Sequence, residues 1–102
     1  MDQNVKRLWV AKLRSGDIAQ ARGTLQDTNG AMCCLGVLVA VQGHKPYDWY
    51  SKSTSNFGIL PVSIAAGVSE YDCATLANKN DGTYGETKCT FAEIADYIEV
   101  TL

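Results

Sequence analysis

Two arginines near the start of the chain, Arg14 and Arg22, are the residues whose type and spacing best suit binding chemistry. A guanidinium group is planar, always charged, and offers a fork of N–H donors that matches a phosphate. Gln20 lies between them in sequence, and its amide can bond a sugar or a base. Trp9 and Trp49 offer ring faces for stacking, although Trp9 also fits the buried side of a helix. These are the parts that a nucleotide requires.

The full candidate ligand-binding set also takes in a glycine next to Arg22 and two polar residues of a later turn. Asn80 and Asp81 suit a ribose hydroxyl or a base edge, but they are equally typical of a plain turn. The set comprises Trp9, Arg14, Gln20, Arg22, Gly23, Trp49, Asn80 and Asp81. No catalytic residue, metal ligand or cofactor is expected.

Charge is unevenly distributed along the 102 residues, whose net charge is −2. Residues 1–22 contain five basic and two acidic side chains and carry a net +3, whereas the rest of the chain carries −5. A basic end on an acidic body suits a small anionic ligand or an acidic partner surface better than a nucleic acid polymer. Solvated helix faces would also explain the pattern.

Four cysteines and one histidine, His44, limit the chemistry of nucleophiles and metals. There is no C-x-x-C pair, so a structural zinc site is not expected. Cys33 or Cys34 at a helix N-terminus would suit a thiol enzyme, but adjacent apolar cysteines are more often packing residues. The glycine signatures of phosphate-binding loops are missing, which leaves non-enzymatic binding as the leading hypothesis.

The first expected element is a helix capped by Asp2 and running to about Arg14, with Ser15-Gly16 as its stop. Its predicted buried stripe follows helical spacing: Val5, Leu8, Trp9 and Leu13. Arg7 and Arg14 are seven residues apart, so they share one exposed stripe, about 10 Å from each other by the helical rise.

A small β-hairpin is expected next, because Asn29-Gly30 is a favoured turn between the short runs 23–26 and 31–33. The apolar segment 33–41 fits a buried helix or a buried strand, and we predict a helix. If it begins near Cys33 or Cys34, the unpaired N–H groups of its first turn would form an anion site.

The second half of the chain is predicted to hold an aromatic loop and three helical segments. Residues 44–58 either pin their aromatic side chains to the core or present them to a partner. A short helix from Pro61 to Gly67, another turn at 75–78 and a final helix with the capping box Thr90–Glu93 follow. The predicted fold is therefore α+β: N-terminal helix, small β-hairpin, buried central helix, short helices and C-terminal amphipathic helix in one domain, 1–102.

No membrane contact is expected from the sequence. Its longest apolar run, 32–41, is far short of the roughly 20 residues that span a bilayer. The chain does not open with the pattern of an export signal, so a cytoplasmic location is predicted.

Several blocks of the chain resemble a family of small uncharacterised phage and bacterial proteins. These blocks are Leu13-Arg-Ser-Gly16, Gln20-Ala-Arg-Gly-Thr-Leu25, Cys33-Cys-Leu-Gly-Val-Leu38, Gly58-Ile-Leu-Pro61, Leu76-Ala-Asn-Lys-Asn-Asp81 and Thr90-Phe-Ala-Glu-Ile-Ala-Asp96. Lys79 and the long segment 82–88 depart from that pattern.

The resemblance implies a phage-encoded protein acting in bacterial cytoplasm against host defence. One such class sequesters cyclic nucleotides or ADP-ribose derivatives without cleaving them, commonly as homo-oligomers. Another class inhibits a host defence protein directly, for which the loop 44–58 would be the contact surface. The leading hypothesis is therefore a sponge for a small phosphate-bearing nucleotide signal, with the protein inhibitor as the alternative and the thiol enzyme third.

Overall fold

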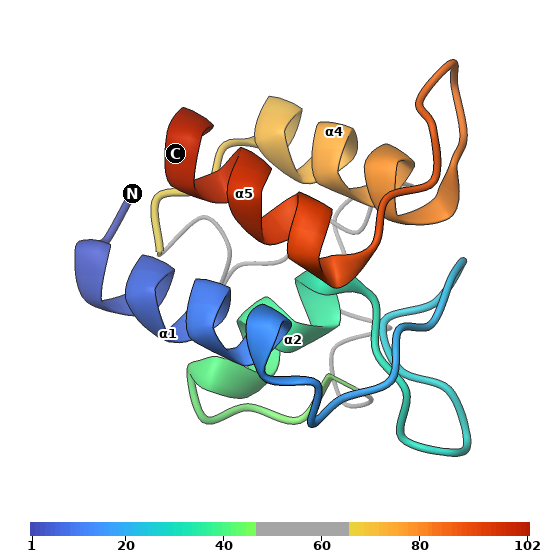
Figure 1. Cartoon of the computed structure of the whole chain (residues 1–102). Helices are drawn as coiled ribbons and strands as arrows, with labels where there is room; N and C mark the ends of the chain where they lie inside the picture. The colour runs from blue at the N-terminus through green and yellow to red at the C-terminus, as the bar shows by residue number, and fades with distance from the viewer. Residues whose placement is uncertain (47–65) are drawn as a thin grey trace.

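The described residues, 1–46 and 66–102 of this computed structural model, contain four helices around one apolar core. They are α1 (Gln3–Ser15), α2 (Cys34–Val41), α4 (Glu70–Asp81) and α5 (Phe91–Thr101). α1 packs mainly against α5 and α2, and α4 completes the layer by contacting both α2 and α5 (Figure 1). The two chain ends therefore lie at the same side of the molecule.

The predicted α+β class is wrong, because the described residues are helical and contain no sheet. The chain does turn at Asp27–Gly30, where the Asp27 carboxylate accepts from the N–H groups of Asn29 and Ala31. However, only isolated bridges follow, from Met32 to Gln20 and to Gln26. Met32 is followed at once by the cap of α2, so the returning strand has no length in which to form a ladder.

Helix α1 begins and ends as the sequence predicts. The Asp2 carboxylate accepts hydrogen bonds from the N–H groups of Asn4 and Val5, and Gly16 ends the helix with φ 77°. Of the predicted buried stripe, Trp9 and Leu13 are buried and Val5 is partly buried, whereas Leu8 is 55% exposed and Val10 is buried instead. The stripe is rotated because α1 lies between two helices, α2 and α5, and not on one of them.

Helix α2 is the centre of the core, as predicted from its apolar sequence, and Cys34 to Val39 are all buried. Gly36 permits this burial. A side chain at that position would collide with the carbonyl oxygen of Leu25, which passes directly against the helix. The central helix is therefore confirmed, and its close contact with the segment before the turn explains why a glycine interrupts an otherwise aliphatic run.

The last two helices are α4 and α5. α4 is longer than the single turn predicted at 75–78, because the Ser69 hydroxyl caps it a turn and a half earlier and Gly82 ends it with φ 71°. α5 confirms the predicted capping box, in which Thr90 and Glu93 exchange two hydrogen bonds.

Three predictions fall wholly or largely on residues 47–65, outside the described part of the chain: Trp49, most of the aromatic loop 44–58, and the helix from Pro61. Of the helices that the structure does describe, none has the length and apolarity required to cross a bilayer.

Candidate functional site

The predicted ligand-binding residues that the structure describes do not meet in one cleft. Trp9 lies in the core, Arg14 forms ion pairs on the surface, and Arg22 is exposed. The others belong to a polar network near the C-terminal end of α4.

Trp9 belongs to the core. Its side chain is fully buried, and its indole N–H donates to the carbonyl oxygen of Cys34 at 2.9 Å. This bond satisfies the single polar group of the indole and ties α1 to the start of α2. In this structure the ring faces are covered by protein, so Trp9 has no face open to a stacked base.

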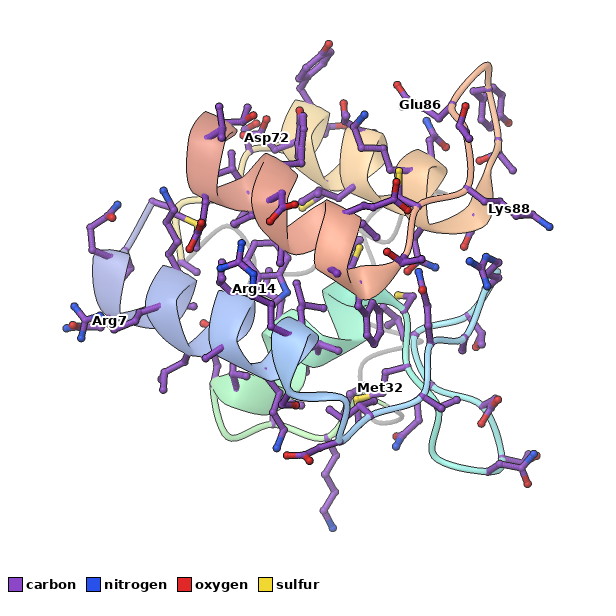
Figure 2. The ribbon with its side chains drawn as sticks, viewed as in Figure 1. Arg7, Arg14, Met32, Asp72, Glu86 and Lys88 are labelled. Atoms are coloured by element: carbon purple, nitrogen blue, oxygen red, sulfur yellow. The ribbon has the colours of Figure 1, made fainter. Side chains whose placement is uncertain are left out.

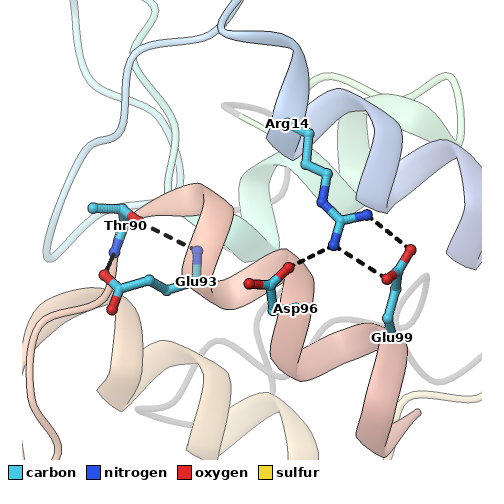
Figure 3. A network of polar contacts seen from close by, with 5 residues as sticks. All are labelled: Arg14, Thr90, Glu93, Asp96 and Glu99. Carbon is cyan, nitrogen blue, oxygen red and sulfur yellow. Dashed lines mark hydrogen bonds and ion pairs between the residues drawn. The ribbon is translucent and has the colours of Figure 1, made fainter.

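Arg14 joins α1 to α5 by binding two carboxylates (Figure 3). Its Nη1 and Nη2 atoms lie 2.8 Å and 3.1 Å from the two carboxylate oxygens of Glu99, and Nη2 also lies 2.6 Å from Asp96 Oδ1. The hydrogen bond to Glu99, followed by that to Asp96, raises the pKa of the Arg14 guanidinium. The predicted phosphate ligand therefore already holds two anions of its own chain.

Four of the predicted residues meet in a polar network centred on Asn80, which is fully buried. The Asn80 Oδ1 atom accepts from Gln20 Nε2 at 2.9 Å and from the N–H of Cys34 at 3.1 Å. Its Nδ2 atom donates to the carbonyl oxygen of Ala21 and to Asp81 Oδ1. All four of its hydrogen-bonding positions are filled by groups of the same chain, so the role of Asn80 is structural.

Gln20, Gly23 and Asp81 complete that network. Gln20 Nε2 also donates to the carbonyl oxygen of Cys89, and the N–H of Gly23 donates to Asp81 Oδ1 at 2.9 Å. The network joins the loop after α1 to α4 and to the segment before α5. Residues predicted to share a ligand site therefore lie together, but they bond one another.

Arg22 is exposed beside this network. Within residues 1–46 and 66–102 it makes no ion pair. It stands next to Gly23, and hence near the C-terminal end of α4, whereas Arg14 faces the middle of α5. The two arginines therefore do not share a site on the described part of the chain.

The N-terminus of α2 does not form the predicted anion site. The N–H of Cys34 is bonded to Asn80 Oδ1, that of Gly36 to Cys33 Sγ, and that of Cys33 to the carbonyl oxygen of Leu25. Because these donors are buried and satisfied internally, no anion can approach them without displacing the core.

The adjacent thiols lie in the same buried region. Burial raises the pKa of Cys33 to about 11 and raises the pKa of Cys34 as well. At neutral pH both are thiols, whereas a nucleophile or a metal ligand needs the thiolate. No cluster of metal ligands occurs in the described ranges.

Two surface grooves border α1 in the described part of the chain. One, of about 460 Å³, faces α2, and the other is an open groove of about 370 Å³ between α1 and α5. It is lined by one basic stripe of α1, two small apolar residues of the same helix and one carboxylate of α5: Gln3, Lys6, Arg7, Val10, Ala11, Arg14 and Glu99. Lys6 Nζ donates to the carbonyl oxygen of Glu99 at 3.2 Å, and Arg7 extends outward from α1 while Arg14 turns toward α5 (Figure 2).

We call this feature the α1 groove. It contains Arg14 but no other residue of the predicted set, and it adds Lys6, Arg7 and Gln3, which the site prediction missed. The signal for Arg7 was present in the sequence, since its seven-residue spacing from Arg14 places both on one stripe. No spacing pattern in the sequence points to Lys6, because its side chain is positioned by the hydrogen bond to the carbonyl oxygen of Glu99 in the last turn of α5.

Residues 1–64 match the family described as Domain of unknown function (DUF8296). The chain belongs to this family. Its description assigns no activity, and no curated protein and no solved structure shows a significant match to the chain. The DUF8296 match agrees with the predicted resemblance to an uncharacterised family.

The DUF8296 match includes α1, α2 and the loop between them, and so all the basic residues of the α1 groove. The residues that hold this region in place lie beyond it. Asn80 binds the loop after α1, and Asp96 and Glu99 bind Arg14. The part of this chain that matches DUF8296 is thus completed by α4 and α5.

Proposed function

We propose that this protein is a non-enzymatic binder of a small phosphate-bearing ligand and that the ligand contacts the α1 groove. The observation that carries the proposal is the gathering of three cations, Lys6, Arg7 and Arg14, on one side of a single helix beside an open groove of about 370 Å³. That volume is in the range of small-molecule sites, which start at about 300 Å³.

The charges of the groove suit a phosphate at the end nearer the N-terminus. Arg14 is held by Glu99 and Asp96, and Lys6 is held by the last turn of α5, so both have partners. Arg7 is exposed, and none of the ion pairs found among the described residues includes it. Its guanidinium is therefore the donor that a phosphate would meet first. Val10 and Ala11 supply an apolar floor for the remainder of the ligand.

The proposal extends to a biological role, which is supported by the resemblance to small phage and bacterial proteins. The ligand would be a nucleotide immune signal, either a cyclic nucleotide or an ADP-ribose derivative, and the protein would sequester it in the bacterial cytoplasm as a phage anti-defence factor, as a homo-oligomer. The raised pKa values of the Cys33 and Cys34 thiols disfavour the third hypothesis, a thiol enzyme that uses either of them. The alternative protein inhibitor depends on residues 44–58, most of which lie outside the described part.

Calorimetric titration with cyclic dinucleotides, cyclic ADP-ribose isomers and unphosphorylated nucleosides tests the proposal. We expect one or more phosphate-bearing compounds to bind and the nucleosides to fail. Arg7→Ala should weaken binding about tenfold or more, because a charge-assisted hydrogen bond is lost. Arg22→Ala is the matched control, since it removes the same exposed group from the same basic segment.

Two outcomes would contradict the assignment. A loss of binding in Arg22→Ala with normal binding in Arg7→Ala would move the site to the loop after α1. Failure of every phosphate-bearing compound to bind the wild-type protein would reject the phosphate ligand altogether.

A further inference from the structure

The groove on the other side of α1, which faces α2, plays no part in the function proposed above. Its volume is about 460 Å³, and its lining comes from α1 and from the end of α2: Leu8, Ala11, Lys12, Ser15, Ala40 and Val41. We call it the α1–α2 groove. Leu8 is 55% exposed. A half-exposed leucine beside a groove of this size provides apolar surface for a ligand.

The polar side chains of the α1–α2 groove already have partners in the chain. The Lys12 ammonium lies 3.3 Å from Asp17 Oδ2, and the Ser15 hydroxyl donates to the carbonyl oxygen of Lys12 at 2.7 Å. The same hydroxyl accepts from the N–H of Asp17 at 3.1 Å. Because these groups are bonded within the chain, the groove offers a ligand mainly apolar contact, and the group that suits it is itself apolar.

Ala11 connects the α1–α2 groove to the α1 groove, because it lines both of them. It follows Arg7 by four residues and Leu8 by three, so the three side chains are neighbours on the surface of α1. Ala11 is exposed, and its side chain is a single methyl group. The surface between the two grooves is therefore low, and one ligand can lie across Ala11 with a part in each groove.

The two sides of Ala11 offer different chemistry. On one side Arg7 is exposed and belongs to none of the ion pairs among the described residues. On the other side Leu8 and Val41 are apolar. This arrangement fits a ligand with an anionic end and an apolar end. A flat ring suits the apolar end better than a flexible chain, because it loses less conformational freedom on binding.

We propose that the α1–α2 groove receives the aromatic ring of the ligand whose phosphate contacts Arg7. The ligand is then a small aromatic phosphate ester that lies across Ala11, and a nucleobase is one such ring. The α1 groove by itself offers the ring little, since Val10 is only 6% exposed. The ring site rests on the phosphate site proposed above and adds the part of the ligand that the α1 groove does not hold.

NMR titration of the full-length protein with three compounds tests this ring site: inorganic phosphate, 1-naphthol and 1-naphthyl phosphate. We expect 1-naphthyl phosphate to bind at least about tenfold more tightly than either of the others, because it alone fills both grooves. It should shift the amide signals of Ala40 and Val41, which inorganic phosphate should leave in place. Equal affinities of the two phosphates, or unshifted Ala40 and Val41 signals, would overturn the proposal.

Variants of Leu8 test the apolar contact. Leu8→Ser should weaken the binding of 1-naphthyl phosphate about fivefold or more and leave that of inorganic phosphate unchanged, since only apolar surface is lost. Leu8→Met keeps the apolar surface and should bind as the wild type does. Val100→Ser is the matched control, because Val100 is 89% exposed and lines neither groove. Unchanged binding of 1-naphthyl phosphate in Leu8→Ser would overturn the ring site.

Arg7→Ala separates a failure of the ring site from a failure of the phosphate site. We expect this variant to weaken the binding of both phosphates. If neither is weakened, the phosphate site is wrong and the ring site is rejected with it. If both are weakened but Leu8→Ser changes nothing, the ring site alone is rejected. If 1-naphthyl phosphate depends on Leu8 but not on Arg7, the two grooves do not share a ligand, which also overturns the proposal.

Discussion

At the scale of single residues, Asn80 is the buried side chain that joins the loop after α1 to α4. It is fully buried and has all its donors and acceptors filled by Gln20, Ala21, Cys34 and Asp81. A buried polar group with a complete set of partners orients the segments around it, whereas the loss of one partner leaves the others unsatisfied. The residue predicted to contact a ligand thus has a structural role instead.

Asn80→Ala should lower the free energy of unfolding by about 3 kcal/mol, because Gln20 and Ala21 and the N–H of Cys34 would lose a buried partner. Urea denaturation followed by tryptophan fluorescence measures the change. Asn4→Ala, an exposed asparagine of α1, is the control and should change stability by less than about 0.5 kcal/mol. A cost for Asn80→Ala as small as that of the control would contradict the central role of Asn80.

At the scale of elements, the contact between α1 and α5 joins an apolar seam to a charged edge. Trp9 and Leu13 contribute to the same core as Ile94 and Ile98, and Arg14 binds Asp96 and Glu99 beside it. All three charged side chains are partly exposed, so water and salt weaken their attraction. The two-carboxylate geometry nevertheless sets the register of α5 along α1, which also brings Lys6 to the end of α5.

This ion pair predicts a pH dependence of stability. The hydrogen bond from Arg14 holds the pKa of Glu99 below its ordinary value of 4.5. A carboxylate with a lowered pKa in the folded protein stabilises it above the unfolded pKa and loses that effect as the pH falls. Arg14→Gln should therefore have a lower Tm than the wild type at pH 7, with a difference that narrows below about pH 4.5.

Thermal unfolding between pH 7 and pH 3 checks this prediction. Arg22→Gln is the control, because Arg22 makes no ion pair in the described residues, and it should follow the wild type throughout. An Arg14→Gln curve parallel to the wild type at every pH would show that the pair adds no pH-dependent stability.

At the scale of the whole molecule, the part that matches the family and the part that follows it form one core. The buried cluster includes Val68, Cys73, Leu76, Phe91, Ile94, Ala95 and Ile98, all beyond residue 64. Removing them would expose the apolar faces of α1 and α2 to water. The basic groove would also lose Glu99 and the α5 side against which it forms.

A fragment of residues 1–64 is therefore expected not to fold cooperatively, although it contains every residue of the family match. Circular dichroism against temperature and the sensitivity to proteolysis measure this, with the full-length chain as the control. A fragment that melts with a sharp transition would show that α4 and α5 are dispensable to the core.

Local structure could be predicted well, because it depends on residues within a few positions of one another. The Asp2 cap, the Gly16 stop and the Thr90–Glu93 capping box were all predicted and confirmed. The length of α4 was underestimated because its buried side includes the polar Asn80, which weakens the apolar pattern. The prediction of a β-hairpin was wrong because only the turn forms. Met32, in the expected return strand, forms a bridge to Gln20, and Cys33 is already the N-cap of α2.

The amino-acid sequence by itself determined where α1, α2 and α5 lie and that the N-terminal region is basic. Only the tertiary structure decided what the polar side chains of that region do. Arg14 meets Glu99 across 85 positions of the chain, and Asn80 meets Gln20 across 60. Such pairings depend on how helices pack, and helical spacing carries no information about which distant helix a side chain will face.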